Sequence, residues 1–451
     1  MNDELGLKVL RELNSYHLGF TDQNEFGMNF LCDYYSIDFK KYEEVKEKGK
    51  LLYDVLCKIN NLYRNAVLQN DRDLLQLFET GLLRHPRIRN LHREWFLSRE
   101  RQMPLFCRAD SVDLKQFIEF HIGLKGTGYI YVLRKVMEKY IARKEGSLFN
   151  FARLKALIGI LRDNLERDVD KIIFYHFFKN TPDVNFFLNE VFSLKITDMG
   201  NPPTVLFDAG QKSNSPSKQL YIAPRDFYSH FLAYVPVFWN PWLQKLFHNH
   251  WYDTILKYSK EKLAVEPPPN LLLEQKIALP LINDARFKDY FTEKEKNIFP
   301  ESYIIKEGAV FCFDKRKYSL QDLVDMPRAK RSFIVKYAGL DLGINWGGKT
   351  VYRIKNESKK RTEKIIKKAL LSYEKRKEPW IVQKDISLKE NIRYFDSEKQ
   401  TVKEGSCYRL YRPYFLFLPC ENKVDVFDIL VLFRDNFKVH AKKDSVIGIV
   451  S

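Results

Sequence analysis

The spacing of apolar positions changes along the chain and predicts where helices and strands lie. From residue 3 to about residue 101, apolar side chains recur every three or four positions, which is typical of helices with one buried face. Val55 and Ile59 belong to one such face, and a second apolar stripe begins at Leu74. Ile365 and Ala369 mark another helical face within a lysine-rich stretch. These faces predict helices that pack against a core.

Runs of β-branched and aromatic residues predict strands elsewhere. Residues 105–110 and 115–121 predict two short strands with a tight connection, followed by a helix from residue 129 to about residue 143. Further strands are predicted at residues 170–176, 204–207, 219–223, 378–386, 406–418 and 424–434. The last two strands are expected to pair in an antiparallel sheet.

Two β-rich runs, residues 332–337 and 350–354, enclose a loop that holds four glycines. This pattern predicts a hairpin with a glycine-rich tip. Glycine lets backbone N–H groups approach an anion, and Lys336 and Lys349 add positive charge, so we interpret the loop as a lid over phosphates. An ordinary hairpin, whose glycines serve only the turn, is the alternative.

The same loop supports a second hypothesis, because residues 343–350 match the P-loop pattern G-x-x-x-x-G-K-[ST]. A P-loop follows a strand of a parallel sheet and leads directly into a helix, whereas here a β-branched and aromatic run begins at Thr350. Only about a hundred residues remain for the other strands of such a domain. A P-loop phosphotransferase is therefore the third of the functions that we consider.

Four polar side chains alternate along the two strands predicted near residue 110. Arg108 and Asp110 lie two positions apart on the first strand, and Glu119 and His121 on the second. Since alternate residues of a strand share a face, a hairpin could bring all four together. Two carboxylates and a third ligand could hold Mg²⁺, and the arginine could hold a carboxylate or a transferring phosphoryl group. Charged strand edges without a function are the alternative.

The composition indicates a globular protein with a preference for anionic partners. The 451 residues suffice for two or three domains, and the 45% hydrophobic content excludes a disordered chain. Lys and Arg number 75 against 58 Asp and Glu, a net charge of +17 that favours nucleotide phosphates, acidic peptides or nucleic acid. A lysine-rich solvated surface explains this excess without a nucleic-acid groove, and no zinc-finger spacing or RNA-binding signature supports one.

The six cysteines are scattered without a C-x-x-C pair, which predicts reduced thiols rather than a disulfide framework. No basic segment followed by an apolar run begins the chain, and the longest apolar run, residues 231–239, is too short to span a membrane. We therefore expect a cytoplasmic protein without a membrane partner. The sequence does not predict the oligomeric state.

Several degenerate motifs follow one another in a fixed order. They are Arg108-Ala-Asp110, Glu119-Phe-His121, Lys125-Gly-Thr-Gly128, residues 275–287, Phe291-Thr-Glu-Lys-Glu295, Phe299-Pro-Glu-Ser302, Ile334-Val-Lys-Tyr337 with Gly347-Gly-Lys-Thr-Val351, and Pro379-Trp-Ile-Val-Gln-Lys384. In this order the chain resembles the circularly permuted ATP-grasp family that includes the glutathionylspermidine-synthase-like ligases. The resemblance covers roughly residue 100 to the C-terminus.

This resemblance implies an α/β to α+β protein, with an ATP-grasp fold whose nucleotide-binding sheet is antiparallel. It divides the chain into a helical N-terminal region (1–101), a metal and substrate half with an inserted α/β unit (102–265), and a nucleotide-binding lid with a C-terminal sheet (266–451). The implied activity is that of an ATP- and Mg²⁺-dependent ligase. ATP would phosphorylate the carboxylate of a small molecule or peptide, and an amine would then displace the phosphate to form an amide.

The resemblance also assigns roles to individual residues. It places Asp110, Glu119 and His121 as magnesium ligands, Arg108 as the residue that steadies the acyl phosphate, and Lys336, Gly347, Gly348, Lys349 and Gln383 in the ATP site. Three departures from the family pattern stand out. His121 replaces an asparagine, Lys125-Gly replaces a Pro-x-Gly element, and Lys384 replaces an acid. Because imidazole is a poorer magnesium ligand than an amide oxygen, the alternative is a catalytically degenerate relative that binds a nucleotide or peptide.

Overall fold

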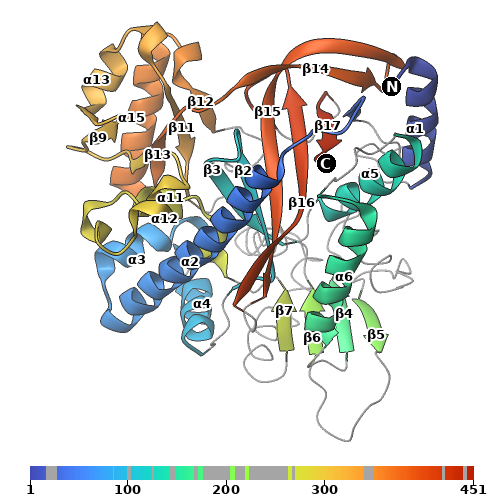
Figure 1. The fold of residues 1–451 in the computed structure, drawn as a ribbon. Coiled ribbons are helices and arrows are strands. Elements are labelled where there is room, and N and C mark those ends of the chain that lie inside the picture. Colours follow the sequence, from blue (N-terminus) through green and yellow to red (C-terminus); the bar gives the residue numbers. More distant parts are fainter. Residues whose placement is uncertain are drawn as a thin grey trace, which may run out of the picture.

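The computed structural model describes most of the chain (Figure 1). The described residues are 1–16, 28–84, 86–98, 103–123, 126–141, 148–166, 171–175, 204–208, 219–222, 263–266, 270–339, 350–418, 422–439 and 444–451. Helices and largely antiparallel sheets combine in an α+β fold. No helix in these stretches is long and apolar enough to cross a membrane.

A seven-stranded sheet occupies the centre of the molecule (Figure 1). Its strands, in spatial order, are β14 (Lys389–Asp396), β1 (Asn29–Leu31), β17 (Val446–Ile449), β16 (Lys423–Arg434), β15 (Thr401–Leu418), β2 (Phe106–Ser111) and β3 (Phe117–Ile122). The antiparallel pairing of β15 with β16 confirms the predicted C-terminal sheet. Strand β1 was not predicted, because its three residues lie in a helical region and pair only with distant parts of the chain.

Helices cover both faces of this central sheet. Helix α2 (Phe39–Gln69) crosses one face diagonally, while α1 (Asp3–Ser15), α5 (Thr127–Tyr140) and α6 (Phe151–Glu166) lie on the other (Figure 1). Successive side chains of β15 alternate between these two layers. Phe415 and Phe417 belong to the core under α2, and Tyr414, Leu416 and Leu418 to the core under α5. A strand buried on both faces accounts for the unbroken apolar run from residue 414 to residue 418.

A buried ion pair fixes α5 to the central sheet. Arg134 is fully buried, and its Nη2 lies 2.6 Å from Oδ1 of Asp428 on β16. The same guanidinium donates to the carbonyls of Phe149 and Val450. Burial raises the pKa of Asp428, although Arg134 acts in the opposite direction. Both buried charges therefore have hydrogen-bond partners, without which their burial would be strongly unfavourable.

A smaller sheet lies beside β3, which is an edge strand of the central sheet. Its order is β12 (Val351–Arg353), β11 (Phe333–Tyr337), β13 (Trp380–Lys384) and β8 (Ser302–Ile304), and every pairing is antiparallel. Helix α15 (Lys359–Arg376) packs on one face through Ile366 and Ala369. The predicted hairpin is confirmed by β11 and β12. The P-loop hypothesis is wrong, because the strand after the glycine-rich segment is antiparallel to the strand before it, and the described strands of this sheet pair only in antiparallel fashion.

The remaining helices surround these sheets. On the N-terminal side are α3 (Arg72–Phe78), η1 (Gly81–Arg84) and α4 (Pro86–Ser98); the later ones are η2 (Leu271–Glu274), α11 (Ala278–Leu281), η3 (Ala285–Phe287), α12 (Glu293–Asn297), α13 (Leu320–Asp325), η4 (Arg328–Lys330) and η6 (Ile354–Asn356). Side chains of α2, α3 and α4 share the core under α2. The described residues before residue 101 are therefore largely helical, as the apolar spacing predicts.

Two further sheets complete the described structure. One contains β5 (Thr204–Asp208), β4 (Lys171–Tyr175), β6 (Gln219–Ile222) and β7 (Leu263–Glu266), and the other pairs β9 (Phe311–Phe313) with β10 (Arg316–Tyr318). Strands β4, β5 and β6 were predicted. The five cysteines within the described residues are free thiols, as their scattered positions suggest.

Candidate functional site

Strands β2 and β3 bring the four predicted polar side chains to one face. In their antiparallel register Arg108 lies opposite His121, and Asp110 lies opposite Glu119. The connection between the strands is held by Ser111, whose Oγ donates to the carbonyl of Gln116 at 2.6 Å. The face therefore carries an arginine, two carboxylates and an imidazole within a few ångströms of one another.

Asp110 is held by two arginines. Nε of Arg108 donates to Oδ1 of Asp110 at 3.0 Å, and Nε of Arg412, on the neighbouring strand β15, lies 3.4 Å from the same oxygen. All three residues are buried. Burial would raise the pKa of Asp110, yet Arg108 and Arg412 outweigh it and hold this pKa below its ordinary value. Asp110 is thus an ionised, internally paired carboxylate.

Glu119 is held by a lysine and by His121. Nζ of Lys276, just after η2, lies 2.9 Å from Oε1 of Glu119, and Nε2 of His121 lies 3.1 Å from the same oxygen. His121 also lies 4.0 Å from Oδ2 of Asp110. Burial would raise the pKa of Glu119, but Lys276 and His121 bring it well below its ordinary value. Both carboxylates are consequently charged and already engaged.

Lys336 reaches this cluster from the smaller sheet. Its neighbours Val335 and Tyr337 pack toward α15, so Lys336 points to the opposite face of β11, where its Nζ donates to the carbonyl of Ile118 on β3 at 2.8 Å. Lys336 is only 5% exposed. Burial lowers its pKa to about 8, although Glu119 acts in the opposite direction. The two sheets therefore meet at a buried lysine.

Gln383 lies on the same face of the smaller sheet as Lys336. It pairs with Ile334 of β11 in the antiparallel register, two positions from the pairing of Lys336 with Ile381. Its side chain is buried, and Nε2 donates to Oγ of Ser302 at 3.0 Å. In this arrangement the side-chain amide of Gln383 is hydrogen-bonded to the neighbouring strand β8.

The structure thus assembles Arg108, Asp110, Glu119, His121 and Lys336 in one cluster, which we call the buried cluster because all of these residues except the partly exposed Glu119 are buried. Gly347, Gly348 and Lys349 lie outside the described residues, and their role as a lid stays a prediction. Two members of the cluster were not predicted, Lys276 and Arg412. Lys276 lies within the motif at residues 275–287, and Arg412 interrupts an apolar and aromatic strand. Both positions could therefore have been recognised as candidate site residues.

The cluster does not fit a magnesium site. Mg²⁺ prefers about six oxygen ligands at near-octahedral geometry. Here the oxygens of Asp110 and Glu119 accept from basic side chains, and His121 is turned onto Glu119 instead of an open position. Within the described residues no group of three or more His, Cys, Asp or Glu side chains is arranged to hold a metal ion. Four basic side chains around two carboxylates favour an anion rather than a divalent cation.

Comparison with known proteins adds the fold. No protein-family model matches the chain, and no curated protein matches it. Among solved structures, a glutathione synthetase-like effector from Globodera pallida, in its apo form, matches with a TM-score of 0.52. The chains share a fold. The match covers 99% of this chain and 96% of that chain at 11% sequence identity, so it includes the helical N-terminal region that the sequence resemblance left out.

The shared fold agrees with the expected α+β architecture, and the ATP-grasp assignment stays a prediction. Neither the circular permutation nor membership of the glutathionylspermidine-synthase-like group follows from it, and both stay predictions. The site residues are likewise untested by the comparison, because at this identity a shared fold carries no residue-level role.

Proposed function

We propose that this chain is a ligand-binding protein of ATP-grasp-like fold, in which the buried cluster receives an anionic ligand without a magnesium centre. A nucleotide is the first candidate ligand. The observation that carries the proposal is the meeting of four basic side chains, Arg108, Lys276, Lys336 and Arg412, with only two carboxylates where the two sheets join.

The chemistry of the cluster suits a phosphate or carboxylate group. Guanidinium and ammonium donors form short charge-assisted hydrogen bonds with such anions. An entering anion would share Lys276 with Glu119 and would find Lys336, which has a carbonyl partner but no ion pair among the described residues. Since the pKa of Lys336 is about 8, this side chain is mostly charged at neutral pH. The cluster therefore supplies positive charge that its own carboxylates do not fully neutralise.

The second candidate is the ATP-dependent carboxylate–amine ligase that the resemblance implies, with ATP and Mg²⁺ as cofactors. It is favoured by the common face of Arg108, Asp110 and Glu119 and by the approach of Lys336 from the opposite sheet. In that function Arg108 would steady the acyl phosphate of a small-molecule or peptide acid. Glu119 and His121 would first have to separate from each other and from Lys276.

Calorimetric titration of ATP in the presence of EDTA tests the proposal. We expect saturable binding to the wild-type chain, weakened at least about tenfold by Lys336→Met because one charge-assisted hydrogen bond is lost. Lys364→Met is the matched control, since Lys364 is exposed on α15 and contacts nothing in the cluster. ATP binding that is absent, or equally affected by both substitutions, contradicts the proposal.

An ADP-release assay separates the two candidates. The protein is incubated with ATP and Mg²⁺ against pooled amino acids, polyamines and short peptides, beside a Glu119→Ala variant. The binding function predicts no ADP above background in any pool. Substrate-dependent ADP release that disappears in Glu119→Ala would establish the ligase instead.

A further inference from the structure

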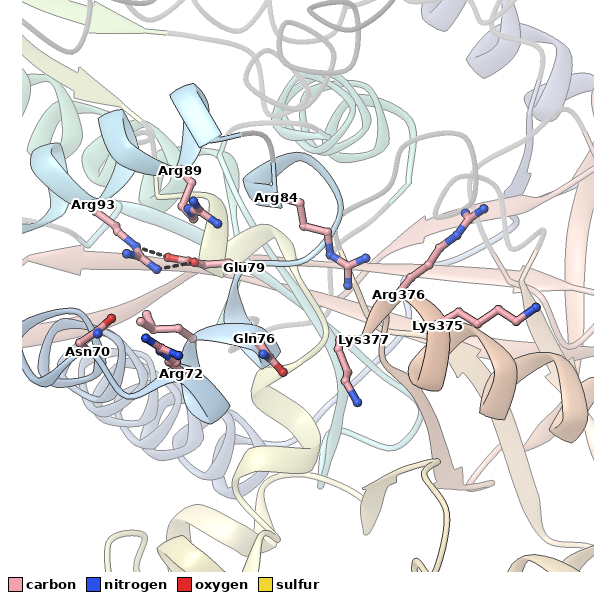
Figure 2. A pocket seen from close by; sticks show the side chains of 11 residues that line it. Asn70, Arg72, Gln76, Glu79, Arg84, Arg89, Arg93, Lys375, Arg376 and Lys377 are labelled. Atoms are coloured by element: carbon pink, nitrogen blue, oxygen red, sulfur yellow. Dashed lines mark hydrogen bonds and ion pairs between the residues drawn. The ribbon is translucent and has the colours of Figure 1, made fainter.

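A second basic site lies away from the buried cluster. A cavity of about 430 Å³ opens between the α3–η1–α4 region and the C-terminal end of α15 (Figure 2). Arg72, Arg84, Arg89 and Arg93 line it from the first side. Because α15 packs on the face of the small sheet that Lys336 turns away from, this cavity and the buried cluster are separate sites.

The other side of the cavity carries three consecutive basic residues. Lys375 and Arg376 end α15, and Lys377 follows as its C-cap in the left-handed conformation, with φ of 51°. All three are exposed. Seven basic side chains from two separate parts of the chain therefore line this cavity. We call the cavity the basic pocket.

The charge of the basic pocket is largely uncompensated. Its one carboxylate, Glu79, is taken by Arg93, which donates to it at 2.5 and 2.7 Å (Figure 2). Arg84 lies 3.4 Å from a carboxylate oxygen of Glu378, which does not line the pocket. The other five basic side chains form no ion pair with any residue that the structure describes.

Two buried guanidinium nitrogens are also left without a partner. Nη2 of Arg84 and Nε of Arg89 are shielded from solvent, and neither donates to another described residue. A buried donor without an acceptor costs free energy, typically more when it is charged. Burial lowers the pKa of Arg84 and the nearby Arg376 adds to this effect, although Glu378 acts in the opposite direction. Both arginines are thus held in a state that an incoming anion would relieve.

Helix dipoles do not explain this arrangement. Basic residues stabilise a helix C-terminus, which accounts for Lys375 and Arg376 at the end of α15. Arg72, however, is the first residue of α3, and Arg89 lies in the first turn of α4, where the dipole disfavours positive charge. These two arginines need another reason to face the same cavity.

We propose that the basic pocket is a second ligand site, which binds a compact small molecule carrying several phosphate groups. A cavity of this volume suits a small ligand rather than a single ion. The planar guanidinium groups present paired N–H donors that match phosphate oxygens, and the exposed lysines supply point charges at the rim. A lone phosphate or carboxylate would not require basic side chains from both sides of the cavity.

The test is calorimetric titration with inositol hexakisphosphate, tripolyphosphate and orthophosphate in turn. We expect the two polyphosphates to bind with one site per chain and orthophosphate to bind at least about tenfold more weakly. Binding should also weaken as NaCl is raised, because the rim is exposed. Orthophosphate binding as strong as that of the polyphosphates, or no binding of either polyphosphate, would overturn the inference.

Substitutions locate the site. The variant Lys375→Gln/Arg376→Gln/Lys377→Asn removes three charges from exposed positions and keeps a residue that tolerates the left-handed conformation at 377. It should bind inositol hexakisphosphate at least about tenfold more weakly. Arg89→Gln, which removes an orphan donor, should weaken binding in the same direction.

Two controls distinguish the basic pocket from general surface charge and from the buried cluster. Lys360→Gln/Arg361→Gln/Lys364→Gln removes the same charges from exposed positions of the same helix and should bind like the wild type. Lys336→Met should do so as well. The inference fails if the pocket and control triple variants lose affinity equally, or if Lys336→Met alone abolishes binding. The proposed nucleotide function would survive either failure, because it depends on the other site.

Discussion

Lys336 shows how far a residue's role can be predicted. Its position at the end of a β-rich run before a glycine-rich loop predicted a lysine directed at phosphates. The structure places it in the buried cluster, but hydrogen-bonded to the carbonyl of Ile118. The partner could not be predicted, because β3 and β11 are more than 200 residues apart in the chain. The neighbours Lys276 and Arg412 were missed for the same reason.

The pKa of Lys336 gives a prediction at this scale. Burial lowers it from an ordinary value of 10.5 to about 8, so above pH 8 the folded state loses this proton before the unfolded state does. The unfolded state then binds more protons than the folded state. The contribution of Lys336 to the free energy of unfolding therefore rises with pH up to about 10.5. Below pH 8 both states carry the proton, and this contribution is constant.

Urea unfolding of the wild type and Lys336→Met at pH 7 and pH 9.5 measures this effect. The free energy of unfolding of the wild type, relative to the variant, should increase by about 2 kcal/mol between the two pH values. Ionisations that do not depend on Lys336 are common to both proteins and cancel, and Glu119, whose pKa lies well below its ordinary value, stays ionised at both pH values. A difference that is the same at both pH values would show that Lys336 keeps an ordinary pKa.

Among the elements, those with a strong local pattern were predictable. The paired strands β15 and β16, the hairpin of β11 and β12, and helix α15 all follow from periodicity and turn residues. Alternation of polar residues allowed β2 and β3 to share one polar face, and the register that places them there is seen only in the structure. Strand β1 does not follow from a local pattern, since only its pairing with β14 and β17 makes its three residues a strand.

Packing of α2 on the central sheet supplies a second prediction. A Cβ at Gly49 would lie 2.5 Å from two ring carbons of Phe415, which is fully buried in the core under the helix. Alanine is the better helix former by about 1 kcal/mol, but the ring would have to move within a packed core. We expect Gly49→Ala to lower the free energy of unfolding by about 1–3 kcal/mol, as measured by urea denaturation.

Gly405→Ala on β15 is the matched control for this substitution. There the nearest atom to a new Cβ is 3.6 Å away, on the ring of Tyr394, so the free energy of unfolding should change by less than about 0.5 kcal/mol. Equal effects at the two glycines would mean that α2 does not lie so close to β15.

At the scale of the whole molecule, the sequence motifs and the charges of the assembled cluster lead to different functional interpretations. The order of the motifs predicted a mixed α+β architecture, which the structure shows, and the match to a solved structure extends over nearly the entire chain. The chemistry of the cluster was not predictable from those motifs. They assigned Asp110, Glu119 and His121 to a metal, whereas the assembled cluster surrounds both carboxylates with cations. Only the three-dimensional neighbours decide between these interpretations.

The most direct measurement is therefore the dissociation constant of ATP in EDTA and in excess Mg²⁺, for the wild type and Glu119→Ala. A cationic site without a metal centre predicts binding in EDTA that is at least as tight as in Mg²⁺, since free ATP carries more negative charge than its magnesium complex. Glu119→Ala should bind ATP as well as the wild type or better, because Lys276 is released. ATP binding that requires Mg²⁺ and is lost in Glu119→Ala would contradict the account and restore the magnesium site.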